Sequence, residues 1–242
     1  MRFWEIDAVR GIAICMMVAY HTVSNLYYFG SGTVWQLSVD LSQWGWVLLQ
    51  KTTALIFLLT VGVSLSIASK HKPYRKIAER GFVILCWGMV ITIVTGILLS
   101  NGTIWFGILH LIGISILIGY WFTGRQIMSL IVGIAMIVGG LFVSNLPQNV
   151  WFLPLGSPPS LFMLDYYPLI PWFGAILIGI AIGERFYGDD RRRFRLPRAK
   201  IIQQMQYTAK PLSWAGKHAL TIYVIHQPLL LAFLWIVGVI SW

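Results

Sequence analysis

The sequence predicts an all-α protein, a polytopic bundle of about seven transmembrane helices with its N-terminus in the cytoplasm. Hydrophobic residues make up 57% of the 242-residue chain and charged residues only 11%, far from the balance of a soluble domain. The apolar residues form stretches of ~20 residues, the length that crosses a bilayer as a helix. Most Lys and Arg residues gather between those stretches, as in the cytoplasmic loops of membrane proteins.

Seven apolar stretches are the predicted transmembrane helices. They cover residues 8–29, 45–68, 79–100, 105–123, 126–144, 168–187 and 212–240. The first should remain in the protein, because it has no small-residue cleavage site and runs into the interfacial aromatic residues Tyr28 and Phe29. Cys15 and Cys86 lie inside apolar stretches, where a free cysteine behaves as a small hydrophobe. We expect residues 1–242 to form a single transmembrane domain.

The charge of the loops predicts the orientation of the bundle. Lys and Arg occur in alternate connections, at residues 70–78, 124–125 and 188–211, and are missing from the connections at 30–44, 101–104 and 145–167. The basic connections are expected in the cytoplasm, with the N-terminus inside and the C-terminus outside. The last outer connection is rich in Pro, Gly and aromatic residues, which favours a cap over the outer face.

The net charge of +10 raises the alternative of nucleic-acid binding. No base-stacking or groove-reading module accompanies this charge, and the basic residues cluster at loops instead of spreading over a surface. We therefore expect no nucleic-acid partner. The lipid bilayer itself is the expected partner of the basic loops.

The first predicted span carries polar residues on one face. At ~100° per residue, Asp7, Arg10, His21 and Asn25 fall within a sector of roughly 60°. Polar and ionisable residues inside a span usually face the bundle interior or a wet cavity. The stripe therefore predicts one wall of a polar passage. A purely structural ion pair between Asp7 and Arg10, or contact of both with lipid headgroups, is the alternative interpretation.

Four ionisable side chains are predicted at a similar depth. His21 and His226 each lie ~20 Å along their helices from the cytoplasmic ends, and Lys51 and His110 lie ~8 to 9 Å from the outer ends. In an apolar core ~30 Å thick, all four fall in the outer third, as if around one chamber. The alternatives are hydrogen-bonded packing roles for His110 and His226, and a Lys51 that extends to the headgroups.

Five blocks of sequence together resemble a known family. They are EIDAVRGIAICMMVAYHTVSNLYYF, TVGVSLSIASKHKPYRKIAERGFVILCWGMVIT, IWFGILHLIGISILIG, DYYPLIPWFGAILIGIAIG and LSWAGKHALTIYVIHQPLL. In this order they are similar to the membrane acetyltransferases related to heparan-alpha-glucosaminide N-acetyltransferase, in their short prokaryotic form. Arg10 and His21, with ten residues between them, also fit a pattern of the wider membrane acyltransferase group. The segment IYVIHQP is similar to the last-helix signature of that group.

The resemblance implies a transmembrane acyltransferase-like domain and a reaction. An acetyl or acyl group would pass from cytoplasmic acyl-coenzyme A, with acetyl-coenzyme A as the expected donor, to an amine or hydroxyl on the outer side. The acceptor would be a small molecule or a glycan, often a sugar. The expected location is the plasma membrane of a prokaryote, as a multi-pass integral protein, and a homodimer is compatible with the sequence.

The resemblance also implies roles for residues. Basic groups at the inner mouth would hold the coenzyme phosphates, and the expected binding residues are Asp7, Arg10, Arg80 and Arg125. His21 is the expected general base, because an imidazole exchanges protons near neutral pH, with His110 or His226 orienting the acceptor or stabilising the oxyanion. The expected substrate-binding residues are Asn25, Lys51, Asp165, Tyr166, His226 and Gln227. No metal ligands are predicted.

One segment departs from the family pattern. The heparan-modifying branch is expected to have a catalytic His in the loop after the first span, but here that loop, GSGTVWQLSVDLSQ, has none. Asp40 is its only ionisable residue. Two alternatives follow: His21 or Asp40 is the base, or the short form carries out a different transfer.

Two other classes of function compete with acyl transfer. A small transporter or proton-coupled carrier would also place polar stripes and His residues within the bilayer, although paired Gly- or Pro-broken helices in matching halves are not evident. A membrane scaffold would use the aromatic outer loop as a partner surface. Binding of acyl-coenzyme A distinguishes the enzyme from both.

Overall fold

The computed structural model describes residues 3–30, 40–99, 101–143, 147–157, 162–188, 191–194 and 199–240. Within these ranges the chain is helical, with isolated β-bridges and no β-strand. The predicted all-α fold class is confirmed. The last residue of two predicted spans, 79–100 and 126–144, most of the loop after the first span and part of the second basic cluster lie outside the described residues.

Most described helices coincide with the apolar stretches, whereas one 3₁₀ helix and one α-helix form in the predicted connections 145–167 and 188–211. The helices are, in order, α1 (Trp4–Phe29), α2 (Trp44–Ser69), α3 (Tyr74–Leu98), α4 (Ile108–Gly119), the 3₁₀ turn η1 (Tyr120–Phe122), α5 (Gln126–Gly139), the 3₁₀ helix η3 (Val150–Leu155), α6 (Leu169–Phe186), α7 (Ala199–Thr208), α8 (Lys210–Lys217) and α9 (Ala219–Ile236). By length and composition, five of the described helices are able to span a membrane: α1, α2, α3, α6 and α9.

Two apolar helical segments are shorter than a full span. They cover Ile108–Phe122 and Gln126–Gly139, so at a rise of ~1.5 Å per residue each falls short of a ~30 Å apolar core. The structure thus supports a helical membrane bundle. The count of seven spans and the cytoplasmic N-terminus remain predictions.

The last predicted span, residues 212–240, differs from the structure. The chain forms two helices there, α8 and α9, separated at His218, whose φ and ψ are −101° and 20°. The His218 backbone N–H donates to the carbonyls of Trp214 and Ala215, and its Nδ1 lies 2.9 Å from the Trp214 oxygen. α8 ends at Lys217 and α9 begins at Ala219, with only His218 between them.

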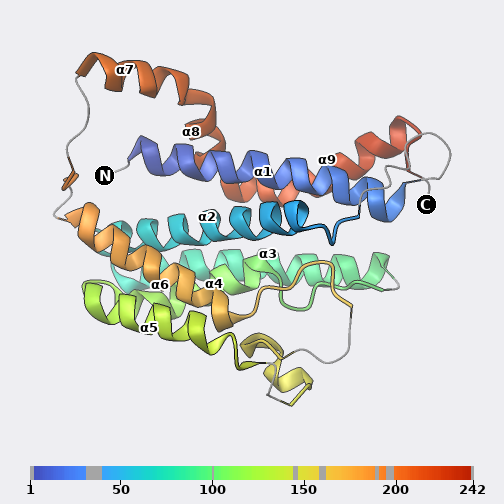
Figure 1. The fold of residues 1–242 in the computed structure, drawn as a ribbon, viewed down its shortest axis with the longest axis horizontal. Helices are drawn as coiled ribbons and strands as arrows, with labels where there is room; N and C mark the ends of the chain where they lie inside the picture. The colour runs from blue at the N-terminus through green and yellow to red at the C-terminus, as the bar shows by residue number, and fades with distance from the viewer. Residues whose placement is uncertain are drawn as a thin grey trace. The chain divides into compact units, whose positions relative to one another are not determined.

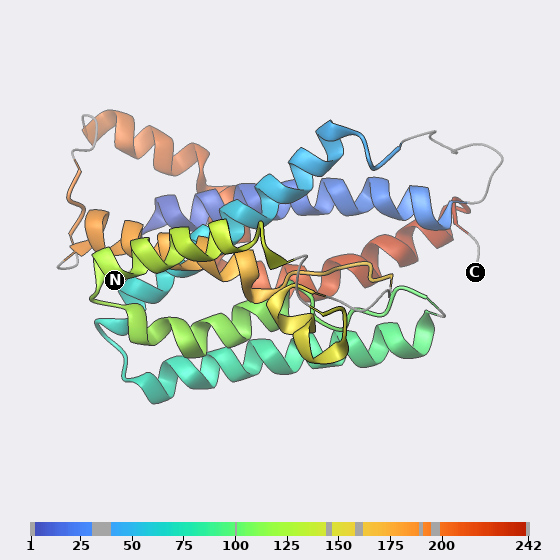
Figure 2. The ribbon, with the colours of Figure 1, turned by 60° about the horizontal axis from the view of Figure 1, so that its bottom comes forward.

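The chain divides into two compact units, each described here by itself. The first, Leu58–Arg195, contains α3, α4, α5 and α6. In it α3 packs against α4, and α5 packs against α6, as the ribbons in Figures 1 and 2 show. Glycines permit these close contacts: a Cβ on Gly133 would lie 2.9 Å from the carbonyl oxygen of Gly174.

The second unit combines Arg2–Phe57 with Leu196–Trp242. Here α1 packs against both α8 and α9 (Figure 1). A Cβ on Gly11 would collide with the backbone of Leu212. The backbones of α1 and α8 are therefore in direct contact at this point. Further along, Ile14 and Met17 of α1 form a buried cluster with Ala219. The α1 face that carries the polar stripe is therefore covered by the C-terminal helices of the same unit.

Candidate functional site

Two imidazoles meet in the second unit. His21 of α1 and His226 of α9 have ring centroids 5.0 Å apart, with the ring planes tilted by 55°. His226 is buried, with 7% of its surface exposed, and His21 is partly exposed. The structure thus brings together two of the predicted site residues, from helices about 200 residues apart in the sequence.

The backbone selects the tautomer of His226. Its Nδ1 lies 2.6 Å from the Tyr223 carbonyl oxygen, and a carbonyl only accepts, so Nδ1 carries the proton. In the neutral ring the lone pair is then on Nε2. Nε2 is buried and has no hydrogen-bond partner among the described residues, a situation that costs about 1–3 kcal/mol. Buried acceptors without donors are rare in native proteins, which marks this atom as a candidate functional group.

An amide pair lies next to the imidazoles. Gln227 Nε2 donates to Asn25 Oδ1 at 2.6 Å, and Asn25 Nδ2 lies 3.5 Å from Gln227 Oε1. Asn25 is one helical turn beyond His21, and Gln227 follows His226 directly. Pro228, inside α9, has no N–H, so the Val224 carbonyl loses its helical donor. The polar stripe of α1 therefore has a polar counterpart on α9.

Near the start of α1 the polar stripe forms an ion pair. Arg10 Nη1 lies 3.4 Å from Asp7 Oδ1 and 3.5 Å from the Gly216 carbonyl oxygen. Asp7 is 3% exposed. Gly216 is in the last turn of α8, where a positive charge interacts favourably with the helix dipole. These two predicted coenzyme-binding residues thus tie α1 to α8, and along α1 Arg10 is ~16 Å from His21.

His110, in the first unit, has protein partners at both ring nitrogens. Nδ1 accepts from the Gly107 N–H at 3.2 Å, so the ring proton is on Nε2, 3.3 Å from Thr92 Oγ1. The Thr92 hydroxyl in turn donates to the Ile104 carbonyl. The ring also stacks on Phe106, with centroids 5.7 Å apart. In this arrangement His110 holds the beginning of α4.

Asp165 and Tyr166 fasten the segment before α6. Asp165 Oδ2 accepts from the Ile108 N–H at 3.1 Å, at the helix N-terminus where a negative charge is favourable. The Tyr166 hydroxyl donates to the Leu153 carbonyl at 2.7 Å, and burial raises the pKa of Tyr166 to about 12. Both predicted acceptor-binding residues therefore make structural bonds, and Tyr166 keeps its proton at neutral pH.

The remaining predicted residues are exposed. Lys51 lies on α2, Arg80 on α3 and Arg125 directly before α5. Asp40 Oδ1 accepts from the Ser42 N–H at 2.8 Å and from the Ser42 hydroxyl at 2.6 Å. These hydrogen bonds lower the pKa of Asp40, because they stabilise the carboxylate.

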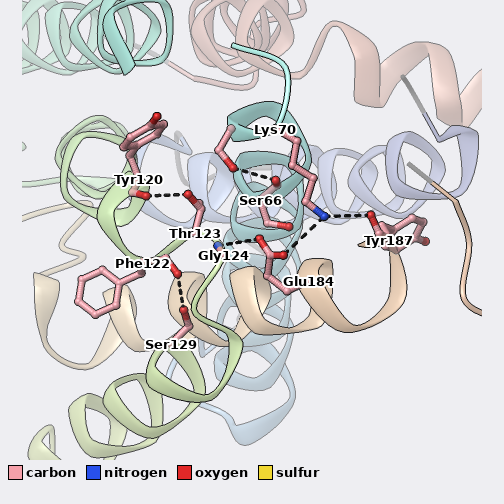
Figure 3. Close-up of polar contacts among 10 residues, drawn as sticks. Ser66, Lys70, Tyr120, Phe122, Thr123, Gly124, Ser129, Glu184 and Tyr187 are labelled. Atoms are coloured by element: carbon pink, nitrogen blue, oxygen red, sulfur yellow. Dashed lines mark hydrogen bonds and ion pairs between the residues drawn. The ribbon is translucent and has the colours of Figure 1, made fainter. Parts of the chain in front are cut away.

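One polar cluster of the first unit was not predicted from the sequence (Figure 3). Glu184 Oε1 accepts from the Gly124 N–H at 3.0 Å, and Glu184 Oε2 lies 3.5 Å from Lys70 Nζ. Lys70 Nζ also lies 3.4 Å from the Tyr187 carbonyl oxygen. From the sequence, Lys70 was predicted only as part of a basic loop. The sequence did contain a signal for this ion pair: Glu184 lies near the end of one apolar stretch, and Lys70 lies just after the end of another.

Comparison with protein families assigns most of the chain. The family model of the heparan-alpha-glucosaminide N-acetyltransferase catalytic domain matches residues 2–228, a range that includes the imidazole pair, the amide pair and the Arg10 ion pair. Neither the curated proteins nor the solved structures yield a match. The chain therefore belongs to the family of the heparan-alpha-glucosaminide N-acetyltransferase catalytic domain.

Proposed function

We propose that this protein transfers an acetyl group from acetyl-coenzyme A in the cytoplasm to an amine or hydroxyl group, most naturally on a sugar, on the outer side of a prokaryotic plasma membrane. Family membership supports acetyl transfer, and the long apolar helices support a membrane enzyme. The observation that carries the proposal is the contact between His21 and His226. It puts two imidazoles side by side within two long helices of mainly apolar residues.

In this proposal His21 is the general base. It takes the proton of the acceptor N–H or O–H while the acceptor atom forms a bond to the thioester carbonyl carbon. The carbon–sulfur bond then breaks, its electron pair goes to sulfur, and the proton passes from His21 to that sulfur. The products are the acetylated acceptor and the free thiol. Imidazole suits this work because it accepts and returns a proton near neutral pH.

The surroundings of the other two candidates argue for His21. The hydrogen bonds from Ser42 lower the pKa of Asp40, which makes its carboxylate a weaker proton acceptor. Both ring nitrogens of His110 have protein partners. Neither nitrogen of His21 has a hydrogen-bond partner among the described residues, so a substrate meets no competitor there.

Exposed basic groups of the first unit fit the polyanionic end of the donor. When bound, acetyl-coenzyme A supplies an acetyl group already activated as a thioester. Its phosphates would accept charge-assisted hydrogen bonds from Arg80 and Arg125, both on segments expected in the cytoplasm. The bond from Gly124 to Glu184 holds the turn that precedes Arg125. Arg10 would contribute positive charge from α1, and Lys51 and the amide pair are proposed to contact the acceptor.

Thiol release from acetyl-coenzyme A tests this function. Purified protein in nanodiscs is incubated with acetyl-coenzyme A and a panel of amino sugars, and free thiol is followed for wild type, His21→Ala and Asp40→Asn. Loss of a general base costs about 10²- to 10⁴-fold in rate, so His21→Ala should fall by that factor. Asp40→Asn should retain wild-type activity, and Arg125→Ala should raise KM for the donor.

Two results would reject the proposal. Wild type that neither binds acetyl-coenzyme A nor releases thiol with any acceptor is not an acetyltransferase of this kind. Activity of His21→Ala equal to wild type would remove His21 from the base role, and loss of activity in Asp40→Asn would assign that role to the carboxylate.

A further inference from the structure

We infer that His226 is a positioning residue for His21: Nε2 of His226 accepts the ring N–H of His21 and thereby determines which nitrogen of His21 faces the acceptor. The inference rests on the proposed function, in which His21 is the base. It is argued from the hydrogen bonds and the contact of the two rings.

His226 presents a hydrogen-bond acceptor, and no donor, at its Nε2 atom. Its Nδ1–H is committed to the Tyr223 carbonyl at 2.6 Å, so Nε2 of the neutral ring presents only a lone pair. That atom is buried and lacks a donor among the described residues. The bond to the α9 backbone therefore makes Nε2 of His226 a hydrogen-bond acceptor, and this acceptor has no donor among the described residues.

The imidazole of His21 is a possible donor to this acceptor. The rings of His21 and His226 are in contact, with centroids 5.0 Å apart. A neutral imidazole has one N–H and one lone pair. If the N–H of His21 turns to Nε2 of His226, the lone pair of His21 is left on its other nitrogen. A base oriented by a third group is the arrangement found in catalytic triads.

The amide pair does not donate to Nε2 of His226. The nearby side-chain amides of Asn25 and Gln227 bond to one another, with Gln227 Nε2 2.6 Å from Asn25 Oδ1. Each amide uses one of its two N–H groups in this pair, and neither amide donates to Nε2 of His226, which has no hydrogen-bond partner among the described residues. The ring of His21 is in contact with the ring of His226, and its two nitrogens make no hydrogen bond to the described residues, so His21 is the side chain placed to donate to Nε2.

Two substitutions of His226 separate positioning from packing. In His226→Asn the amide nitrogen takes the place of Nδ1, keeps the bond to Tyr223 and puts nothing at Nε2. In His226→Gln the longer side chain reaches the Nε2 position and supplies a carbonyl acceptor there. His218→Asn is the matched control, because His218 also has its Nδ1 at a backbone carbonyl, that of Trp214, and has no role in the inference.

The first readout is the tautomer of His21, by ¹⁵N NMR of histidine-labelled protein, with its signals assigned from their loss in His21→Gln. Wild type, His226→Gln and His218→Asn should show a single His21 tautomer, and His226→Asn a mixture. The second readout is turnover. His226→Asn should lower kcat by about 10- to 100-fold, the usual cost of removing a partner that orients a histidine, with KM for acetyl-coenzyme A unchanged, and His226→Gln should restore most of it.

Equal His21 tautomer populations in the Asn and Gln variants would overturn the inference, as would equal turnover, high or low, in both. The NMR readout needs no turnover. A single tautomer that depends on residue 226, in a protein that transfers no acetyl group, would therefore reject the proposed function and keep the positioning role. If wild type transfers the acetyl group but the His21 tautomer is the same in all variants, the proposed function is kept and the positioning role of His226 is rejected.

Discussion

The pair formed by Asn25 and Gln227 places two amides in an apolar setting. Asn25 is 2% exposed, so its side chain has little access to water and depends on Gln227 for a partner. A polar group buried without a hydrogen bond is costly, and in membrane helices a neighbouring helix usually supplies the bond. The pair therefore fixes the register of α1 against α9 at the level of the imidazoles.

Breaking this amide pair should destabilise the protein without unfolding it. We expect Asn25→Leu and Gln227→Leu each to lower the free energy of unfolding by about 0.5–2 kcal/mol, the range for interhelical hydrogen bonds in membranes. The double variant should lose less than the sum, because no unpaired amide remains. Thermal unfolding in nanodiscs measures this, with the exposed Gln204→Leu as control. Strictly additive losses would mean that the two amides do not interact.

Helical geometry explains which site residues could be predicted from the sequence. The count of ~1.5 Å per residue that put His21 and His226 at a similar depth started at residue 212, which the structure places in α8 and not in α9. Their contact therefore comes from the packing of α9 on α1 and does not test that count. The same counting assigned a depth to His110 but could not predict its partners, which come from another helix and from the turn before α4. The path of a loop also decides the bonds of Asp165 and Tyr166. Tautomers and turn contacts depend on tertiary structure, so periodicity alone does not reach them.

At the scale of helices, apolar length predicted the boundaries well where a span is long. α2 covers Trp44–Ser69 against the predicted 45–68, and α6 covers Leu169–Phe186 against 168–187. The prediction of a single span over residues 212–240 was wrong, because it joined most of α8 to α9. Leu212 and Trp214 resemble the start of a span, but the polar residues around them belong to a separate short helix that packs on α1.

The close contact of α1 and α8 should be sensitive to a single methyl group. A Cβ on Gly11 would collide with the Leu212 carbonyl, so Gly11→Ala should lower stability by about 1–3 kcal/mol, as overpacking does. Gly45→Ala is the matched control, since Gly45 also lies in a helix but a Cβ there meets nothing within 4 Å. The control should be neutral or stabilise by up to about 1 kcal/mol. Thermal unfolding of the two variants gives the comparison, and equal effects would contradict the close approach.

For the whole molecule, the orientation in the membrane is the main prediction left to measure. In a background of Cys15→Ser and Cys86→Ser, we expect the Asp40→Cys variant to react with a membrane-impermeant maleimide on intact cells. The Lys72→Cys variant should react only after permeabilisation. Both positions are exposed, and α2 is the described helix between them. Labelling of both from the same side would show that α2 does not cross the bilayer.

The number of spans is harder to predict than the fold class, and the reason lies around α4. The segment before α4 is not helical: it bridges Gly102 to Met163 and Phe106 to Tyr166, and the Ile104 N–H donates to Thr95 Oγ1 at 3.1 Å. Irregular backbone is tolerated at membrane depth where the protein satisfies its polar groups. The predicted span 105–123 takes in the last three residues of this segment, before α4 begins at Ile108, because hydropathy registers side chains and not backbone bonds.

Pro228 gives the imidazole pair a mechanical property. A helix that lacks a backbone bond bends more easily at that place, and the missing bond, to the Val224 carbonyl, falls on the turn of α9 that carries His226. Bending there changes the separation of the two rings, while α8 stays packed against α1 through Gly11 and Gly216. In the proposed function, the turn of α9 beside His226 is therefore the part that adjusts to a bound substrate, while the amide pair of Asn25 and Gln227 keeps α9 in register with α1.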